Sequence, residues 1–260
     1  MGQSFIMVQG STGGNIAVAL SALRPDEPVL VQRNAHKSVL AGLVQSGARP
    51  VWLEPQWDSR FGVAHGLDAE VVERGLTDSG AKALWLLHPP TYYGTTADIT
   101  ALDALCRRFG ATLLVDGAHS PHFAFHDDLP PAAERSGAAA TVQSVHKILS
   151  GGLSQAAVLH IDPERLDPAT VRRALQLVQT TSPHFAIMAP SIWPAARWLV
   201  MDAICSPRRC SGRGGRPSGW PRYPDCRSSA APTPPARAPG SAISTRPNCS
   251  SAPAGWLPTP

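Results

Sequence analysis

Thr112-Leu113-Leu114-Val115-Asp116-Gly117-Ala118-His119 is a short apolar run that ends at an acid and a glycine. Such a run is typical of a strand that is buried on both faces of a sheet. On both sides of this segment, similar runs alternate with longer stretches of helical period over residues 1–200. Regular alternation of this kind predicts an α/β fold with a mainly parallel sheet flanked by helices.

The same pattern gives the individual elements. Strands are expected at residues 5–9, 28–32, 50–53, 83–87, 112–115, 141–144 and 156–161. Helices are expected at residues 15–23, 37–45, 69–79, 99–109 and 163–178, with Asp68 as the N-cap of the third. Ligands of open parallel sheets bind at the carboxyl ends of the strands. Asp116 stands at one such end, and Lys147 follows another predicted strand.

Composition changes abruptly near residue 205. The segment from Cys205 to Pro260 holds twelve prolines, eight arginines, no lysine and one acid. It carries a net charge of +7, which leaves −3 for residues 1–204 of a chain whose net charge is +4. The segment has too few apolar side chains to offset the entropy of ordering it. We predict one domain over residues 1–204 and a disordered Pro/Arg/Ser-rich tail over residues 205–260. The abrupt change favours a frameshift product over a natural basic tail.

Cysteine spacing and hydropathy exclude several classes of protein. The tail cysteines match no paired zinc-binding pattern, so no metal is expected. The N-terminus lacks the basic and apolar regions of a signal peptide. No apolar run reaches the ~18 residues that a membrane helix needs. A soluble, cytoplasmic protein without a membrane partner is expected.

Two predicted strand-to-helix junctions carry groups suited to a phosphorylated ligand. Gly10-Ser11-Thr12-Gly13-Gly14-Asn15 follows the first strand. Its glycines let the backbone approach an anion, its hydroxyls donate hydrogen bonds, and the helix N-terminus adds positive potential. It matches neither a Walker A loop nor a dinucleotide fingerprint, and a plain capped turn is the alternative. At the second junction, Arg33-Asn34-Ala35-His36-Lys37-Ser38 places a histidine that could stack on a flat ring or cap the helix.

Asp116 and Lys147 together indicate one cofactor chemistry. A lysine amine can hold an aldehyde cofactor as a Schiff base, and a buried carboxylate can keep the ring nitrogen of that cofactor protonated. Lys147 should then be largely buried, with a lowered pKa. Taken separately, an N-cap aspartate and a surface lysine would explain the two residues. Their order along an α/β chain favours pyridoxal 5′-phosphate (PLP) as the cofactor.

Five elements of the sequence resemble the PLP-dependent Orn/Lys/Arg decarboxylases. They are Gly-Ser-Thr-Gly-Gly-Asn (10–15), Arg-Asn-Ala-His-Lys-Ser-Val (33–39), Pro-Thr-Tyr-Tyr-Gly (90–94), Val-Asp-Gly-Ala-His-Ser-Pro-His-Phe (115–123) and Ser-Val-His-Lys-Ile-Leu (144–149). The resemblance covers roughly residues 5–200 and implies the large domain of fold type I, a PLP-dependent transferase-like fold. Gly117 departs from the family, which often has an acid there, and Gly13-Gly14 varies the usual phosphate loop.

The resemblance also implies how the cofactor would be held. The residues that would bind its phosphate are Ser11, Thr12, Gly13 and Ser144. The residues that would surround its ring are His36, which stacks on it, Ala118, which lies against its face, and His119, which lies beside it.

The implied catalytic set is Lys147, Asp116, His36 and His146. Lys147 would form the Schiff base directly after His146, and Asp116 would pair with the ring nitrogen. The implied reaction is decarboxylation of lysine, ornithine or arginine to a polyamine-type amine, in a homodimer or higher homo-oligomer. Relative to the family the chain is expected to be shortened at both ends, a large-domain fragment that lacks the smaller C-terminal domain.

Two other classes of function remain open at this stage. The same fold and cofactor could serve an aminotransferase or a β-eliminating lyase, although such enzymes usually grip the substrate carboxylate with an arginine from the small domain. The chain could instead be a non-enzymatic remnant whose basic tail binds nucleic acid through phosphate contacts. The tail lacks regularly interleaved aromatic residues, so nucleic acid is not the expected partner.

Overall fold

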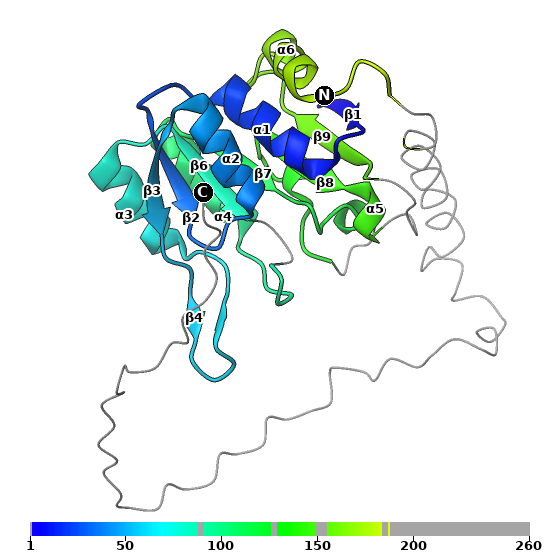
Figure 1. Cartoon of the computed structure of the whole chain (residues 1–260). Coiled ribbons are helices and arrows are strands. Elements are labelled where there is room, and N and C mark those ends of the chain that lie inside the picture. The colour runs from blue at the N-terminus through cyan, green and yellow to red at the C-terminus, as the bar shows by residue number, and fades with distance from the viewer. Residues whose placement is uncertain (1, 88–90, 126–128, 149–154, 184–186, 188–260) are drawn as a thin grey trace, which may run out of the picture. The chain divides into compact units, whose positions relative to one another are not determined.

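A seven-stranded sheet forms the centre of the described part of the chain (Figure 1). The computed structural model describes residues 2–87, 91–125, 129–148, 155–183 and 187. In spatial order the strands are β1 (Gln3–Met7), β9 (Ala157–Ile161), β8 (Ala140–Ser144), β7 (Thr112–Asp116), β6 (Ala83–Leu87), β2 (Pro28–Gln32) and β3 (Arg49–Leu53). The neighbours from β8 to β3 pair in parallel, whereas β9 pairs antiparallel with both β1 and β8. The predicted α/β fold with a mainly parallel sheet is confirmed.

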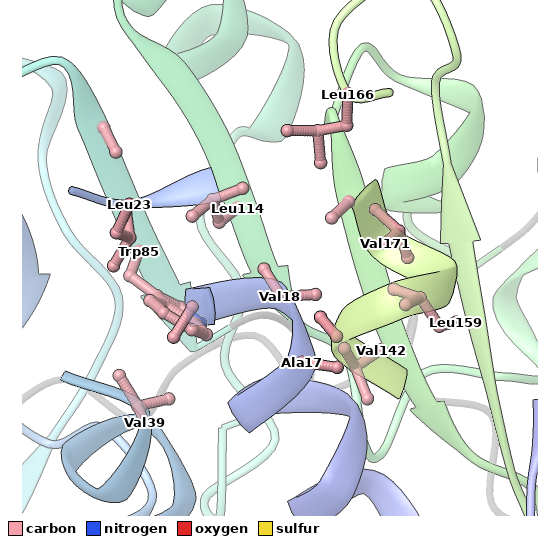
Figure 2. Close-up of a cluster of buried hydrophobic side chains, with 14 of the residues drawn as sticks. Ala17, Val18, Leu23, Val39, Trp85, Leu114, Val142, Leu159, Leu166 and Val171 are labelled. Carbon is pink, nitrogen blue, oxygen red and sulfur yellow. The ribbon is translucent and has the colours of Figure 1, made fainter. Parts of the chain in front are cut away.

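Helices cover both faces of this sheet. Those on one face are α1 (Gly10–Ala22), α2 (Lys37–Ser46) and α6 (Pro168–Val178), and those on the other are α3 (Ala69–Ser79) and α4 (Ile99–Arg108). Each face of the sheet has its own hydrophobic core, the first under α1, α2 and α6 and the second under α3 and α4. Figure 2 shows part of the first core, where Val18 of α1 and Val142 of β8 belong to one buried cluster. Side chains of β6 alternate between the two cores, because Trp85 lies in the first and Leu84 and Leu86 lie in the second. This burial on both faces explains the continuously apolar strands of the sequence.

Short-range sequence signals set several helix ends. Asp98 and Asp167 occupy the N-cap positions of α4 and α6, and their side chains accept hydrogen bonds from backbone N–H groups of the first turn. Gly47 and Gly80 end α2 and α3 in the left-handed conformation, which glycine adopts without strain. Asp68 occupies the N-cap position of α3 as predicted, but its side chain makes no capping hydrogen bond.

Some boundaries differ from the prediction. β1 lies at Gln3–Met7 rather than at residues 5–9, and α1 begins at Gly10 rather than at residue 15. The predicted phosphate loop is therefore the first turn of the helix itself. α6 begins only at Pro168, where Asp167 caps it and the fixed φ of proline suits the first helical position.

Several short elements have no counterpart in the prediction. They are the hairpin of β4 (Trp57–Asp58) and β5 (Val63–Ala64), the short helix α5 (Val145–Ile148) and two 3-10 turns at Phe123–Phe125 and Ala133–Arg135. Strands of two residues and a helix of four are too short to show a hydrophobic period.

Gly14 allows α1 to lie close to the sheet. A Cβ atom at this position would lie 2.6 Å from Cε of Met7 and 2.7 Å from Cγ1 of Val142, which is closer than carbon atoms can approach. The absent side chain brings the following residue, Asn15, within hydrogen-bonding distance of the end of β7.

Among the described residues, no helix is long and apolar enough to cross a membrane, and no cluster of three His, Cys, Asp or Glu side chains could hold a metal ion. The predicted domain boundary at residue 204 and the predicted tail over residues 205–260 lie outside the described residues, as do residues 88–90 of the loop that follows β6.

Candidate cofactor site

Asp116 lies at the carboxyl end of β7 and is only 2% exposed. Its Oδ2 accepts a hydrogen bond of 2.9 Å from Nδ2 of Asn15, and its Oδ1 accepts one of 3.2 Å from the backbone N–H of Ala118. Both donors are neutral. Within the described part of the chain, no basic side chain forms a salt bridge with Asp116. The carboxylate therefore lies buried at a strand end without a direct cationic partner.

A chain of hydrogen bonds connects Asp116 to His36. Nδ2 of Asn15 donates to Oγ of Ser38 as well, at 2.8 Å. Oγ of Ser38 lies 2.7 Å from Nδ1 of His36, and this nitrogen also accepts the backbone N–H of Ser38 at 3.2 Å. His36 is the N-cap of α2, and its Nδ1 makes the capping hydrogen bond. The sequence-based alternative that this histidine caps the helix is therefore confirmed. The other ring nitrogen, Nε2, is not used by the cap.

The electrostatics of Asp116 reflect its burial. Burial raises the pKa of this carboxyl above its usual value, and the hydrogen bond from Asn15 opposes the shift. A positive charge on His36, the hydrogen bond from Ala118 and the charge of Lys147 would each act in the same direction as Asn15. The site therefore contains an acid that a nearby positive charge would stabilise.

Lys147 lies on α5, directly after β8. Its Nζ is 3.0 Å from Nε2 of His119, and the ring of Tyr92 meets the His119 ring edge-on, with the ring centres 5.7 Å apart. Partial burial lowers the pKa of Lys147, although the nearby carboxylate of Asp116 acts against this effect. The pKa of His119 is lowered by burial and by the charge of Lys147. A neutral His119 can therefore accept a hydrogen bond from the lysine ammonium.

The prediction that Lys147 is largely buried is wrong for this structure, because its side chain as a whole is exposed, whereas the predicted lowering of its pKa agrees with the partial desolvation of its amine. The physical reason is its position. Lys147 projects from the single helical turn that follows the carboxyl end of β8, and not from a strand between two layers of helices.

The first turn of α1 meets the end of β8. Oγ of Ser144 donates a hydrogen bond of 2.9 Å to Oγ of Ser11. α1 has no acid in its first turn, and its N-cap residue Gln9 makes no side-chain capping bond, which leaves backbone N–H groups of this turn available to an anion. Gly13 is buried in the same turn, and Thr12 is exposed.

The remaining predicted residues surround these groups. Ala118 is buried one turn after Asp116. Nδ1 of His146 donates to the carbonyl of Ala156 at 3.0 Å, so this ring is fixed against the segment that leads into β9. Neighbouring atoms fill the space that a side chain at residue 117 would need, because a Cβ atom on Gly117 would lie 2.7 Å from Oγ of Ser120. An acid at this position would displace that serine.

Two residues of the site are absent from the sequence-based set. Asn15 and Ser38 belong to the motifs that mark the site, yet no spacing rule assigns them a contact with Asp116. One signal could have found Asn15, because it is the one amide side chain in helix α1, whose other residues are glycine, small hydroxyl and apolar residues. A buried amide is expected only where it has hydrogen-bond partners.

The chain is similar to one family of known proteins over most of its length. Residues 1–198 match the family described as Orn/Lys/Arg decarboxylase, major domain. The chain is 34% identical to the arginine decarboxylase of Bacillus cereus over 187 residues, which cover 72% of this chain and 40% of that protein. It is 35% identical to the arginine decarboxylase of Bacillus subtilis over 187 residues, which cover 72% of this chain and 38% of that protein. The chain thus spans about two fifths of the length of these curated relatives.

Solved structures agree on the fold. The constitutive lysine decarboxylase of Escherichia coli superposes with a TM-score of 0.63 at 25% identity, covering 75% of this chain and 29% of that one. A PLP-dependent aminotransferase from Streptococcus suis superposes with a TM-score of 0.60 at 14% identity, covering 76% of this chain and 51% of that one. At that identity the second likeness concerns the fold alone.

Proposed function

Because the chain belongs to the Orn/Lys/Arg decarboxylase family, we propose that residues 1–204 form a PLP-binding domain for the decarboxylation of a basic amino acid. The observation that carries the proposal is the buried Asp116 carboxylate. It lies at the carboxyl end of a parallel strand, where ligands of such sheets bind, and only neutral groups donate to it. A buried carboxylate is unfavourable unless a cation approaches it.

The groups present in the site fit PLP. A protonated ring nitrogen would supply the cation that Asp116 lacks. The first turn of α1, with its uncapped N–H groups and the paired hydroxyls of Ser11 and Ser144, suits a dianionic phosphate. In this proposal Thr12 and Gly13 complete the phosphate site, His36 and Ala118 lie on the two faces of the ring, and His119 lies beside it. When bound, PLP supplies an electron sink for the electron pair that remains when the bond to the carboxylate breaks.

The protein's own side chains would then control the protons on Lys147 and on the ring nitrogen, and would orient the lysine. Lys147 Nζ would hold the cofactor aldehyde and must first lose a proton. Partial desolvation lowers the pKa of Lys147, which eases loss of that proton to solvent, and His119, kept neutral by its own lowered pKa, can accept a hydrogen bond from Nζ at 3.0 Å. Asp116 Oδ1 or Oδ2 would hold the ring nitrogen in its protonated form. His146, the residue before Lys147, would anchor the short helix that carries the lysine, because its ring is fixed to the carbonyl of Ala156.

Arginine is the first substrate to test, because the two Bacillus relatives named above are arginine decarboxylases. Lysine and ornithine are the alternatives within the same chemical class. We further propose that the chain works as a homodimer or larger homo-oligomer. Light scattering behind a sizing column, with and without PLP, measures this directly, and a monomer under both conditions would contradict it.

The decisive experiment is the visible absorbance of the purified full chain with added PLP. We expect a visible band that borohydride abolishes, with the cofactor fixed covalently to the peptide that contains Lys147. Lys147→Ala should lose the band. Lys82→Ala, at an exposed lysine that precedes β6, is the matched control and should keep it. Release of carbon dioxide from each of the three amino acids then tests the reaction. A band that survives in Lys147→Ala would reject the assignment of the site.

A further inference from the structure

Asn15 is a fully buried polar residue of the site, at 0% exposure. Its amide has two N–H groups, and both are used, one on Oδ2 of Asp116 and one on Oγ of Ser38. Its carbonyl oxygen Oδ1 is buried and has no hydrogen-bond partner among the residues that the structure describes. A buried polar atom without a partner is unfavourable by about 1–3 kcal/mol. The two contacts must therefore favour this orientation of the amide strongly enough to offset that loss.

The orientation of the amide depends on the charge of Asp116. An ionised carboxylate can only accept hydrogen bonds, so it requires the N–H side of Asn15. A protonated carboxyl could donate its O–H to Oδ1 of Asn15 instead, which would give the unpartnered oxygen a partner. The present arrangement, with Nδ2 on Oδ2 of Asp116, is therefore the one that belongs to the ionised acid.

Ser38 carries the same requirement to His36. Since Oγ of Ser38 accepts from Asn15, its own proton is free to donate to Nδ1 of His36, which already accepts the backbone N–H of Ser38. Nδ1 must then be unprotonated. A neutral His36 in this state carries its proton on Nε2, the nitrogen that the cap leaves unused. A chain of hydrogen bonds through Asn15 and Ser38 thus connects the ionised Asp116 to the tautomer of His36 that carries its proton on Nε2.

We infer that Asn15 is a positioning residue, which holds Asp116 as an oriented carboxylate and, through Ser38, sets the tautomer of His36. The purpose of this arrangement rests on the proposed function, because a carboxylate is what keeps a PLP ring nitrogen protonated. The arrangement itself is a property of the protein without cofactor. Asn15 touches neither the cofactor nor the reacting atoms in this inference, and it acts only through its neighbours.

A purely structural role for Asn15 is the competing explanation. α1 and α2 pack closely here, and a Cβ atom on Gly42 would lie 3.4 Å from the backbone oxygen of Asn15. Under that explanation, loss of the amide would lower stability but would leave the ionisation of Asp116 unchanged. The titration of one carboxyl group therefore separates the two explanations.

The test uses the full chain without PLP, labelled with 13C at the aspartate carboxyl carbons, and follows the Asp116 resonance by NMR as pH changes. The resonance is assigned by its absence in Asp116→Asn. In Asn15→Leu we expect Asp116 to titrate about one pH unit or more higher than in the parent, because a hydrogen bond to the charged form is lost. Ser21→Ala, which removes a buried hydroxyl from the same helix, is the control and should not move the titration. The same titration in Asn15→Leu as in the parent would overturn the inference.

Groups other than Asn15 also act on this titration and must remain in place. They are His36 at the start of α2, Lys147 on α5, the backbone N–H of Ala118, and Tyr92 after β6. If Asn15→Leu does not fold, Asn15→Ala serves the same purpose, because it only removes atoms. Ser38→Ala should raise the Asp116 titration less than either, since it leaves the N–H group on Oδ2 in place.

A second measurement adds PLP that carries 15N at the ring nitrogen. In the parent we expect the chemical shift of a protonated ring, and in Asn15→Leu a shift toward the unprotonated value. Bound PLP with the same shift in both proteins would overturn the link from Asn15 to the cofactor. If the parent binds no PLP, the proposed function fails, and the carboxyl titration still decides the role of Asn15.

Discussion

Nζ of Lys147 lies 3.0 Å from Nε2 of His119, although 28 residues separate them in the chain. The contact joins the ends of β7 and β8, which are parallel neighbours in the sheet. It places a hydrogen-bond acceptor beside the amine that must be neutral in order to react. His119 is therefore the group through which the environment of Lys147 can be measured.

We predict that Lys147→Ala raises the pKa of His119. The charge of Lys147 helps to lower that pKa, whereas burial is the larger cause, so the change should be a partial return toward the usual value. Histidine ring protons followed by NMR across pH report it. Lys82→Ala should leave His119 unchanged, and a His119 titration that is unmoved by Lys147→Ala would contradict the contact.

Asp116→Asn should make the cofactor-free protein less sensitive to pH. The folded-state pKa of Asp116 is raised, so the folded protein binds more protons than the unfolded chain between the unfolded value of about 3.9 and the folded one. The parent therefore loses stability as pH rises through this window, and Asp116→Asn should not. Urea unfolding at several pH values measures the difference, with the exposed Asp78→Asn as a control that keeps the parent's dependence.

The same substitution should abolish productive PLP binding, since an amide cannot keep the ring nitrogen protonated. A gain in stability together with a loss of cofactor is typical of a charged residue that is retained for function. Asp116→Asn protein that is less stable than the parent at neutral pH would show that the carboxylate already has a favourable partner.

Burial on both faces made the sheet predictable from sequence, because β6 and β7 read as continuous apolar runs. The position of Asp116 followed from the same pattern, since the acid ends such a run. The contact of Asn15 with Asp116 could not be predicted, because it spans 101 residues and depends on how closely α1 approaches the sheet. Neither residue type nor local spacing contains that distance.

The start of α1 shows a different limit. Gly10 to Gly14 read as a loop because glycines weaken any helical signal, yet Gly10 begins the helix with a φ of +69°. Close packing of this turn on the sheet, which tertiary structure alone provides, overrides the weak local preference. The exposure of Lys147 differs from the prediction for a related reason, because its chemistry indicates burial, whereas its position on the short helix that follows β8 determines its exposure.

Arg165 should be important for stability although it lies away from the candidate site. It pairs with the buried Asp103 at 2.7 Å and also donates to the backbone carbonyls of Gly137 and Ala111. Arg165→Met would remove these three hydrogen bonds while Arg107 still pairs with Asp103, so the loss should exceed the ~1 kcal/mol of an exposed pair and stay below the about 3–5 kcal/mol of an unpaired buried charge. Urea unfolding measures this loss.

The matched control for Arg165 is the exposed Arg173, which lies 4.0 Å from Asp167. Arg173→Met should change stability by less than about 1 kcal/mol, because solvent screens this pair. Equal effects of the two substitutions would show that burial does not determine the strength of these ion pairs.

Gly14→Ala should link packing to the candidate site. The new methyl group would overlap Cε of Met7 and Cγ1 of Val142, so α1 must move away from the sheet, at a cost of about 1–3 kcal/mol. Asn15 moves with the helix, and its hydrogen bond to Asp116 lengthens. We therefore expect weaker PLP binding as well as lower stability.

Val142→Ala alone should lower stability by leaving a cavity. In the double variant the smaller side chain makes room for the methyl group, so the two losses should be less than additive. Recovery of PLP affinity in the double variant would show that the position of α1 governs the site, whereas strictly additive losses would show that the methyl group acts on something other than Val142.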